Sequence, residues 1–127
     1  MSEQLAVAFD DDVKSFEPGA TVRGRALWLL SEDPVAIEVR LFWHTAGKGD
    51  VDLGIVGTTR FDTPGTAGDR PFEFVLPMRP WSCSGRLVSV IWSVEIVALP
   101  REDSQHFTIT VGPGGREVIL RGGALSS

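Results

Sequence analysis

The residues best suited to bind a hard cation are three consecutive acids, Asp10, Asp11 and Asp12. Asp50 and Asp52 add two carboxylates in a later loop, and carboxylate oxygens are ligands that Ca²⁺ prefers. The ligand spacing of a calcium-binding loop is not met, and no glycine occupies the turn position that such a loop requires. We therefore interpret these side chains as solvated loop acids and expect no bound metal ion.

Nucleophilic side chains occur in the segment Ser82-Cys83-Ser84, and either histidine, His44 or His106, could serve as their base. Nucleophilic catalysis also needs a third, orienting group and an oxyanion hole, and no known signature surrounds the cysteine. The two histidines are also possible ligands of a transition metal, but alone they form only part of a ligand set. We expect no catalytic residue, no cofactor and no enzymatic activity.

Two further features exclude classes of ligand. The run Gly112-Pro113-Gly114-Gly115 lacks the Lys-Ser/Thr end of a phosphate-binding loop and precedes no helical pattern, so we interpret it as a tight turn. The formal net charge of the 127-residue chain is -5, which disfavours general nucleic-acid binding. No nucleic-acid partner is expected.

Cellular location is inferred from the cysteine content and the first residues. Cys83 is the single cysteine, so no intramolecular disulfide can form and a reducing compartment is compatible. The start of the chain lacks the basic and apolar regions of a secretory signal, and no run approaches the roughly 18 apolar residues of a membrane span. We expect a cytoplasmic protein without a transmembrane segment.

The elements that position these residues are strands, because apolar residues recur with period two and hardly ever with a helical period. The clearest alternation is Val35, Ile37, Val39, Leu41 and Trp43, and Val51, Leu53 and Ile55 resume it toward Phe61. A Gly/Pro segment over 63–70 is expected to cross between sheets. About eight strands are predicted, over 5–9, 21–30, 35–43, 51–61, 72–77, 87–99, 107–111 and 117–120. This number of strands favours an all-β, antiparallel immunoglobulin-like sandwich.

The same alternation separates the four tryptophans. Trp28, Trp43 and Trp92 fall on the inward parity of their strands, whereas Trp81 follows Pro80 in a loop. Trp81 is therefore a possible aromatic platform for a small ligand or a carbohydrate.

The outward residues of two predicted strands form the main candidate for a binding face. If the strands over 21–30 and 35–43 are neighbours, one exposed face carries Arg23, Arg25, Arg40, Phe42 and His44, whose guanidinium and aromatic groups suit protein recognition. Two alternatives remain open. Arg40 could instead pair with Glu38 or Glu17, and Phe42 could be covered by the Gly-rich loop or the C-terminal tail.

An immunoglobulin domain proper is disfavoured, because the chain has no cysteine pair and no tyrosine. The ordered combination of Phe16-Glu17-Pro18-Gly19-Ala20-Thr21-Val22-Arg23-Gly24, the 35–43 strand, Phe72-Glu73-Phe74-Val75-Leu76-Pro77 and the segment 85–95 resembles an arrestin-type domain. The resemblance spans roughly residues 13 to 111. It implies an adaptor or scaffold fold that usually occurs as two tandem domains. No residue here matches a phosphate-binding position, and one domain cannot form the polar core between two.

The sequence thus predicts a single-domain, bacterial, arrestin-like protein spanning 1–127, with a flexible tail from about residue 121. We expect a non-enzymatic protein-interaction or scaffold module, and the alternative is a small-ligand or carbohydrate-binding sandwich. A protein partner could add to an exposed sheet edge. The segment 117–120 could cover an edge or exchange between two copies in a homodimer.

Overall fold

The chain forms a two-layered β structure, which we describe from a computed structural model over residues 3–47, 51–85 and 87–120. The expected flexible tail lies outside the described residues. The strands are β1 (Gln4–Phe9), β2 (Ser15–Phe16), β3 (Thr21–Leu29), β4 (Ala36–Gly47), β5 (Leu53–Asp62), β6 (Ala67–Val75), β7 (Cys83–Ser84), β8 (Val88–Leu99), β9 (Asp103–Val111) and β10 (Val118–Ile119). Two short 3-10 turns, η1 (Asp10–Asp12) and η2 (Pro113–Gly115), interrupt them.

The strands divide into a small and a large sheet. The small sheet has the order β1-β3-β6, and the path through the large sheet is β10-β7-β8-β4-β5. Strand β9 shares one edge of β8 with β7: Trp92 to Ala98 pair with β9, whereas Val90 pairs with Cys83 of β7. All pairings are antiparallel except two short ones, β2 with β9 and β10 with β7. The expected antiparallel sandwich is confirmed.

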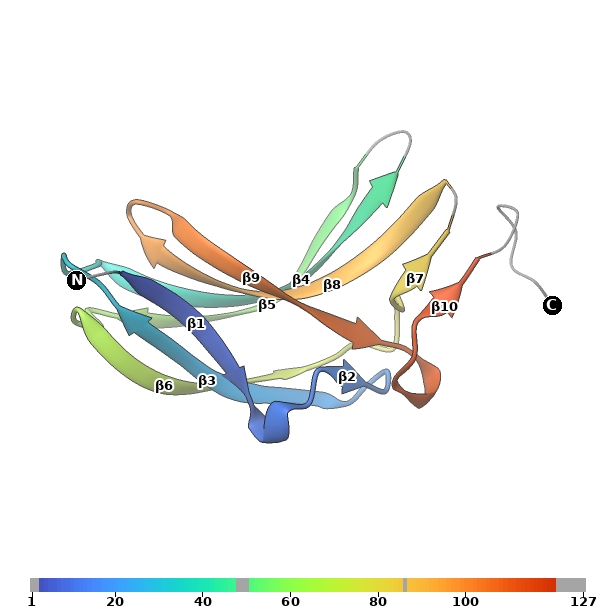
Figure 1. Ribbon diagram of the computed structural model, residues 1–127, viewed down its shortest axis with the longest axis horizontal. Helices are drawn as coiled ribbons and strands as arrows, with labels where there is room; N and C mark the ends of the chain where they lie inside the picture. Colours follow the sequence, from blue (N-terminus) through green and yellow to red (C-terminus); the bar gives the residue numbers. More distant parts are fainter. Residues whose placement is uncertain (1–2, 48–50, 86, 121–127) are drawn as a thin grey trace.

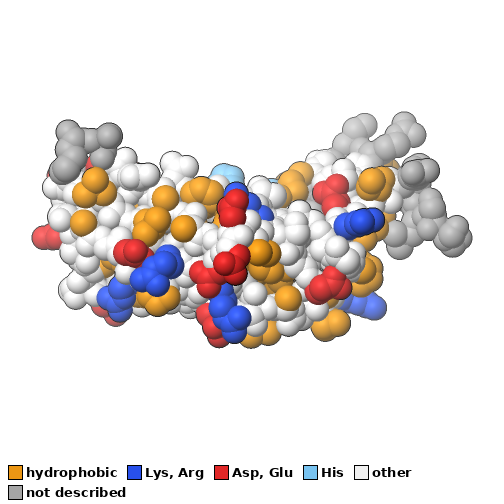
Figure 2. All heavy atoms as spheres, turned by 60° about the horizontal axis from the view of Figure 1, so that its bottom comes forward, with side chains coloured by type: hydrophobic (Ala, Val, Ile, Leu, Met, Phe, Trp, Pro, Cys, Tyr) orange, Lys and Arg blue, Asp and Glu red, His pale blue; other side chains and the backbone are white. Residues whose placement is uncertain are grey.

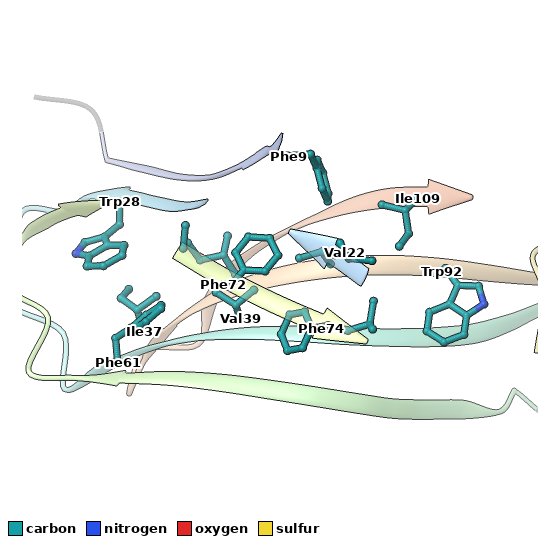
Figure 3. Close-up of a cluster of buried hydrophobic side chains, with 14 of the residues drawn as sticks. Phe9, Val22, Trp28, Ile37, Val39, Phe61, Phe72, Phe74, Trp92 and Ile109 are labelled. Atoms are coloured by element: carbon teal, nitrogen blue, oxygen red, sulfur yellow. The ribbon is translucent and has the colours of Figure 1, made fainter. Parts of the chain in front are cut away.

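The core lies between the two sheets because each strand turns alternate apolar side chains inward. Val22 and Trp28 of β3 face Ile37 and Val39 of β4, and all four side chains are buried (Figure 3). The Trp28 and Phe61 rings stack across the sandwich with their centroids 6.0 Å apart. Aromatic rings therefore supply much of the contact between the layers.

Two of the tryptophan rings need a glycine on the paired strand. Trp28 lies opposite Gly68, and Trp43 lies opposite Gly54. A Cβ atom at Gly68 would lie 2.1 Å from Trp28 Cζ2, and one at Gly54 would lie 2.3 Å from Trp43 Cε2. Each ring occupies the space that a side chain would take, which is how a glycine inside a strand contributes to packing.

The large sheet extends beyond the small sheet that covers it. Strands β4 and β8 have 12 residues each, whereas β3 and β6 have nine each. On the inner side of β8, Val94 and Trp92 are fully buried, Val90 is half-buried and Val88 is 41% exposed. Figure 1 shows the end of β4, the start of β5 and the start of β8 rising away from the small sheet. The described residues of the small sheet therefore leave one end of the inner face uncovered.

A bulge in β5 changes which side chains face solvent. Leu41 lies opposite Gly57 and Phe42 lies opposite Ile55, so Val56 is an extra residue in β5. A continuous alternation would place Leu53 and Ile55 on the same face as buried Phe61. Because side chains alternate between faces, the extra residue reverses the parity, and Leu53 and Ile55 are 61% and 59% exposed.

The predicted strand boundaries needed other corrections. Strand β6 begins at Ala67, so the crossing between sheets is shorter than the predicted 63–70 segment. The strand accommodates Pro71, which has no backbone N–H, because β6 lies at the edge of the small sheet. The two-residue strands β2 and β7 lie in segments interpreted as turn and loop. Val35 precedes β4 and is exposed. The 117–120 segment does cover an edge, because β10 pairs with β7 of the same chain.

The cross-strand contact between Gly68 and Trp28 can be tested by Gly68→Ala. The new methyl group displaces a ring that is 4% exposed, and we expect the free energy of unfolding to fall by about 1–3 kcal/mol. Urea unfolding followed by circular dichroism measures this loss. Thr66→Ala, at an exposed neighbouring position, is the control and should change stability by less than about 0.5 kcal/mol. Equal effects of the two substitutions would contradict the packing described.

Candidate functional site

The single arginine-rich face predicted from the sequence does not form. Strand β3 is the centre of the small sheet and β4 belongs to the large sheet, so the two strands are not neighbours. Arg23 and Arg25 lie on the outer face of the small sheet, whereas Arg40, Phe42 and His44 lie on the outer face of the large sheet. The connection between the strands crosses from one layer to the other, which places the two groups on opposite sides of the sandwich.

The arginines of the small sheet, on β3, pair with acids on the neighbouring strand β6. Arg23 Nε donates to Glu73 Oε2 at 2.8 Å, which raises the pKa of the arginine, and Arg25 Nε donates to Asp69 Oδ1. These four side chains are more than half exposed. Figure 2 brings the bottom of Figure 1 forward and shows basic and acidic side chains interspersed over this side. Such exposed pairs contribute little to stability and leave little uncompensated charge for a ligand.

The outer face of the large sheet carries a chain of charges, which we call the charge ladder: Arg60, Glu38, Arg40 and Glu95. Glu38 accepts from Arg40 Nη2 at 2.7 Å and from Arg60 Nη1 at 2.8 Å. Arg40 Nη1 also lies 3.6 Å from Glu95 Oε1. The alternative that Arg40 pairs with Glu38 is therefore confirmed. Hydrogen bonds from Arg40 and Arg60 hold the pKa of Glu38 below its usual value, even though partial burial opposes this shift.

Beside the charge ladder lies an apolar surface of which the sequence predicted only Phe42 and His44. It consists of Phe42 and His44 of β4, Leu53 and Ile55 of β5, and Ile91 of β8; we call it the bulge patch. Phe42 lies opposite Ile55, and His44 lies opposite both Leu53 and Ile91. The Phe42 and His44 rings stack with centroids 6.0 Å apart. The five side chains thus form one continuous surface on the outside of three neighbouring strands.

Two polar atoms under this face have no hydrogen-bond partner among the described residues. They are His44 Nδ1 and the Oγ of Ser93, a residue that lies opposite Phe42 and is fully buried. Burial of an unpaired polar group costs roughly 1–3 kcal/mol. The bulge patch therefore combines exposed apolar side chains with unsatisfied polar groups directly beneath or beside them.

A second candidate site lies at the uncovered end of the inner face. It is an apolar groove of about 470 Å³, which we call the Trp81 groove, and it is lined by Arg79, Pro80, Trp81, Cys83, Val90, Val118 and Leu120. Trp81 is 40% exposed, Trp28 and Trp92 are buried, and Trp43 is half-buried against the core. Trp81 is thus the most exposed of the four tryptophans, as its loop position predicted.

The other residues with chemical potential are not brought together. His44 and His106 lie on β4 and β9, which are separated by β8, and neither lines the groove next to Cys83. Ser82 is buried, and its hydroxyl accepts a hydrogen bond from the Val111 backbone N–H at 2.9 Å. Asp10, Asp11 and Asp12 are exposed in η1. Within the described ranges, no three His, Cys, Asp or Glu side chains are grouped to hold a metal ion.

The described part of the chain also contains no helix that is both long and apolar enough to cross a membrane.

Comparisons with known proteins identify the fold. No family model matches the chain, and no curated protein matches its sequence. Spo0M, a sporulation control protein from Bacillus subtilis, has a similar structure, with a TM-score of 0.59 and 20% identity over 89% of this chain. A β-glucosidase from Listeria innocua aligns with a TM-score of 0.49, 13% identity, and coverage of 94% of this chain but 16% of its own.

The likeness to Spo0M places the fold among arrestin-like β-sandwiches, which confirms the fold class predicted from the sequence. The chain spans about half of the Spo0M chain, since the match covers 50% of it.

The partly buried charge ladder can be tested by Glu38→Gln. This substitution removes the negative charge between Arg40 and Arg60 and replaces one of the two acceptor oxygens with an amide NH₂, which cannot accept from a guanidinium. We expect a loss of about 1–3 kcal/mol in the free energy of unfolding at pH 7. The pKa of Glu38 is lower in the folded chain than in the unfolded chain. Its stabilisation is therefore present above the unfolded value of about 4.5 and is lost as the pH falls through the folded value.

Urea unfolding at pH 7 and pH 3 checks both statements, since the difference between Glu38→Gln and the unaltered chain should shrink at the lower pH. Glu73→Gln is the matched control, because its pair with Arg23 is more than half exposed and should contribute less than about 1 kcal/mol. A loss for Glu73→Gln as large as that for Glu38→Gln would show that burial of the ladder has no energetic consequence.

Proposed function

We propose that this chain is a single-domain, bacterial, arrestin-like protein that acts in the cytoplasm as a protein-interaction or scaffold module and catalyses no reaction. The observation that carries the proposal is the bulge patch. Leu53 and Ile55 are more than half exposed on β5, whose other face is turned toward the core, so most of their apolar surface lies outside the internal packing. Exposed apolar residues gathered on one surface are typical of sites that bind another protein.

The surroundings of the bulge patch also suit a protein interface. Such interfaces have an apolar centre and a polar, solvated rim. The bulge patch supplies the centre, where the half-buried Phe42 lies beside the exposed Ile55. The charge ladder supplies the rim, because its member Arg40 lies two residues from Phe42 along β4. Because Arg40 already pairs with Glu38, we assign recognition mainly to Phe42, His44, Leu53 and Ile55, with Arg40 at the rim.

The mode of binding that we propose uses the free edge of β5 as well as its side chains. Among the described strands, β5 ends the path through the large sheet and pairs with β4 on one side only. An edge strand offers unpaired backbone donors and acceptors to an added strand. The partner is a different protein or, across a two-fold axis, a second copy of this chain.

The shared fold with Spo0M, a sporulation control protein, supports a regulatory or interaction role in preference to catalysis. The phosphate sensing of tandem arrestin domains is not proposed, because no residue of this sequence matches a phosphate-binding position.

The bulge patch can be tested by Ile55→Ser combined with Phe42→Ser. We expect loss of at least tenfold in affinity for a protein captured from native lysate and then purified, because truncation of central apolar contacts typically costs more than about 1 kcal/mol each. Capture compared by quantitative mass spectrometry identifies the partner, and surface binding kinetics measure its affinity. Light scattering shows whether the partner is a second copy.

Val75→Ser is the matched control. Val75 is an apolar side chain of β6 and is 65% exposed on the outer face of the opposite sheet. Its substitution should leave partner binding unchanged. Full partner binding by the Ile55→Ser/Phe42→Ser variant, with unchanged stability, would remove the bulge patch from consideration.

A further inference from the structure

The Trp81 groove lies on the opposite side of the large sheet from the bulge patch and has no role in the function proposed above. Its floor follows the strand pairing: Val118 of β10 lies opposite Cys83 of β7, which lies opposite Val90 of β8. Val90 belongs to the inner parity of β8, as do the buried Trp92 and Val94. The floor is therefore an extension of the core surface beyond the point where the small sheet ends.

Hydrogen bonds fix the wall of the groove. Trp92 Nε1 donates to the Pro80 carbonyl oxygen at 2.9 Å, which ties the 77–82 loop to the end of the core. Trp81 Nε1 donates to the Met78 carbonyl oxygen at 2.8 Å. The indole N–H of Trp81 is thus already used, and the ring presents apolar surface to the groove. A wall held in place before binding lowers the conformational cost of taking up a ligand.

Apart from the thiol of Cys83, the lining is apolar except at one charged side chain. Among the described residues that line the groove, Arg79 alone is charged, and it forms no ion pair with any other described residue. A guanidinium group matches the geometry of a carboxylate, to which it can donate two parallel hydrogen bonds. The groove therefore offers a cation next to an extended apolar surface.

We propose that the Trp81 groove binds a medium-chain fatty acid, with the acyl chain along Trp81, Val90 and Val118 and the carboxylate at Arg79. The volume of 470 Å³ falls in the range of roughly 300–1,000 Å³ that is usual for small-molecule sites. A carbohydrate does not fit this lining, because a sugar needs several hydrogen-bonding side chains beside an aromatic ring. The ring nitrogen of Trp81 is already bonded, and the remaining lining residues are apolar apart from Cys83 and Arg79.

The proposal is tested by calorimetric titration of the full chain with octanoate, decanoate and decanol below their aggregation limits. Affinity should rise about fourfold with each added methylene, which corresponds to about 0.8 kcal/mol per buried CH₂. Decanoate should bind about tenfold more tightly than decanol, because only the acid pairs with a guanidinium. Arg79→Gln should remove this preference while leaving decanol binding unchanged. Arg116→Gln is the control, as Arg116 is exposed but does not line the groove.

Two further measurements locate the site. Decanoate should slow alkylation of Cys83, the single thiol, and should shift the backbone amide resonances of residues 81–83, 90 and 118–120 in nuclear magnetic resonance spectra. The Ile55→Ser variant should bind decanoate with unchanged affinity. A failure of decanoate binding would therefore say nothing against the function proposed for the bulge patch. The proposal is overturned by absence of saturable binding, by equal affinities for decanoate and decanol, by full decanoate affinity of Arg79→Gln, or by resonance shifts confined to other residues.

Discussion

The arrangement of this molecule depends on one constraint: the large sheet is longer than the small sheet that covers the inner face of the large sheet. Where the two sheets overlap, apolar side chains such as Val22 and Ile37 are fully buried and form the core. Trp92 lies at the end of this overlap, buried and hydrogen-bonded to the loop at Pro80. Beyond Trp92 the same strand face is open, which produces the groove beside Trp81. Core and groove are thus two parts of one surface.

The outer face of the same sheet depends on a different feature, the extra residue Val56. A β-strand sends successive side chains to opposite faces, so one inserted residue reverses the orientation of every side chain beyond it. On one side of the bulge, Phe61 packs in the core; on the other, Leu53 and Ile55 face solvent beside Phe42. An apolar sequence that would otherwise extend the core becomes a largely exposed surface.

Much of the fold could be predicted from the sequence because period-two alternation is a local property. The burial of Trp28 and Trp92 and the exposure of Trp81 followed from it directly. The pairing of strands did not follow, because β3 and β4 have the same apolar alternation whether they are neighbours or face each other across a sandwich. The arginine face that joined Arg23 to Arg40 was wrong for this reason.

The candidate sites were predictable only in part. Trp81 was identified by its position in a loop, but the residues that complete its groove come from three strands, two of them only two residues long. Strands this short have no detectable alternation. Phe42 and His44 of the bulge patch were predicted, but its β5 residues were missed because Leu53 and Ile55 continue the pattern of a buried strand. The signal that could have found the bulge is Gly57, a glycine inside the strand next to Val56.

The proposed contact between a protein partner and the outer face of the large sheet at Ile55 can be probed in the cell. It is tested most directly by placing a photoreactive amino acid at Ile55 and, in a second variant, at Val75, which is similarly exposed on the opposite sheet. Irradiation in the native cell should give a discrete covalent adduct from position 55 and none from position 75. Absence of an adduct at position 55, or the same adducts from both positions, would show that this face does not bind a protein partner.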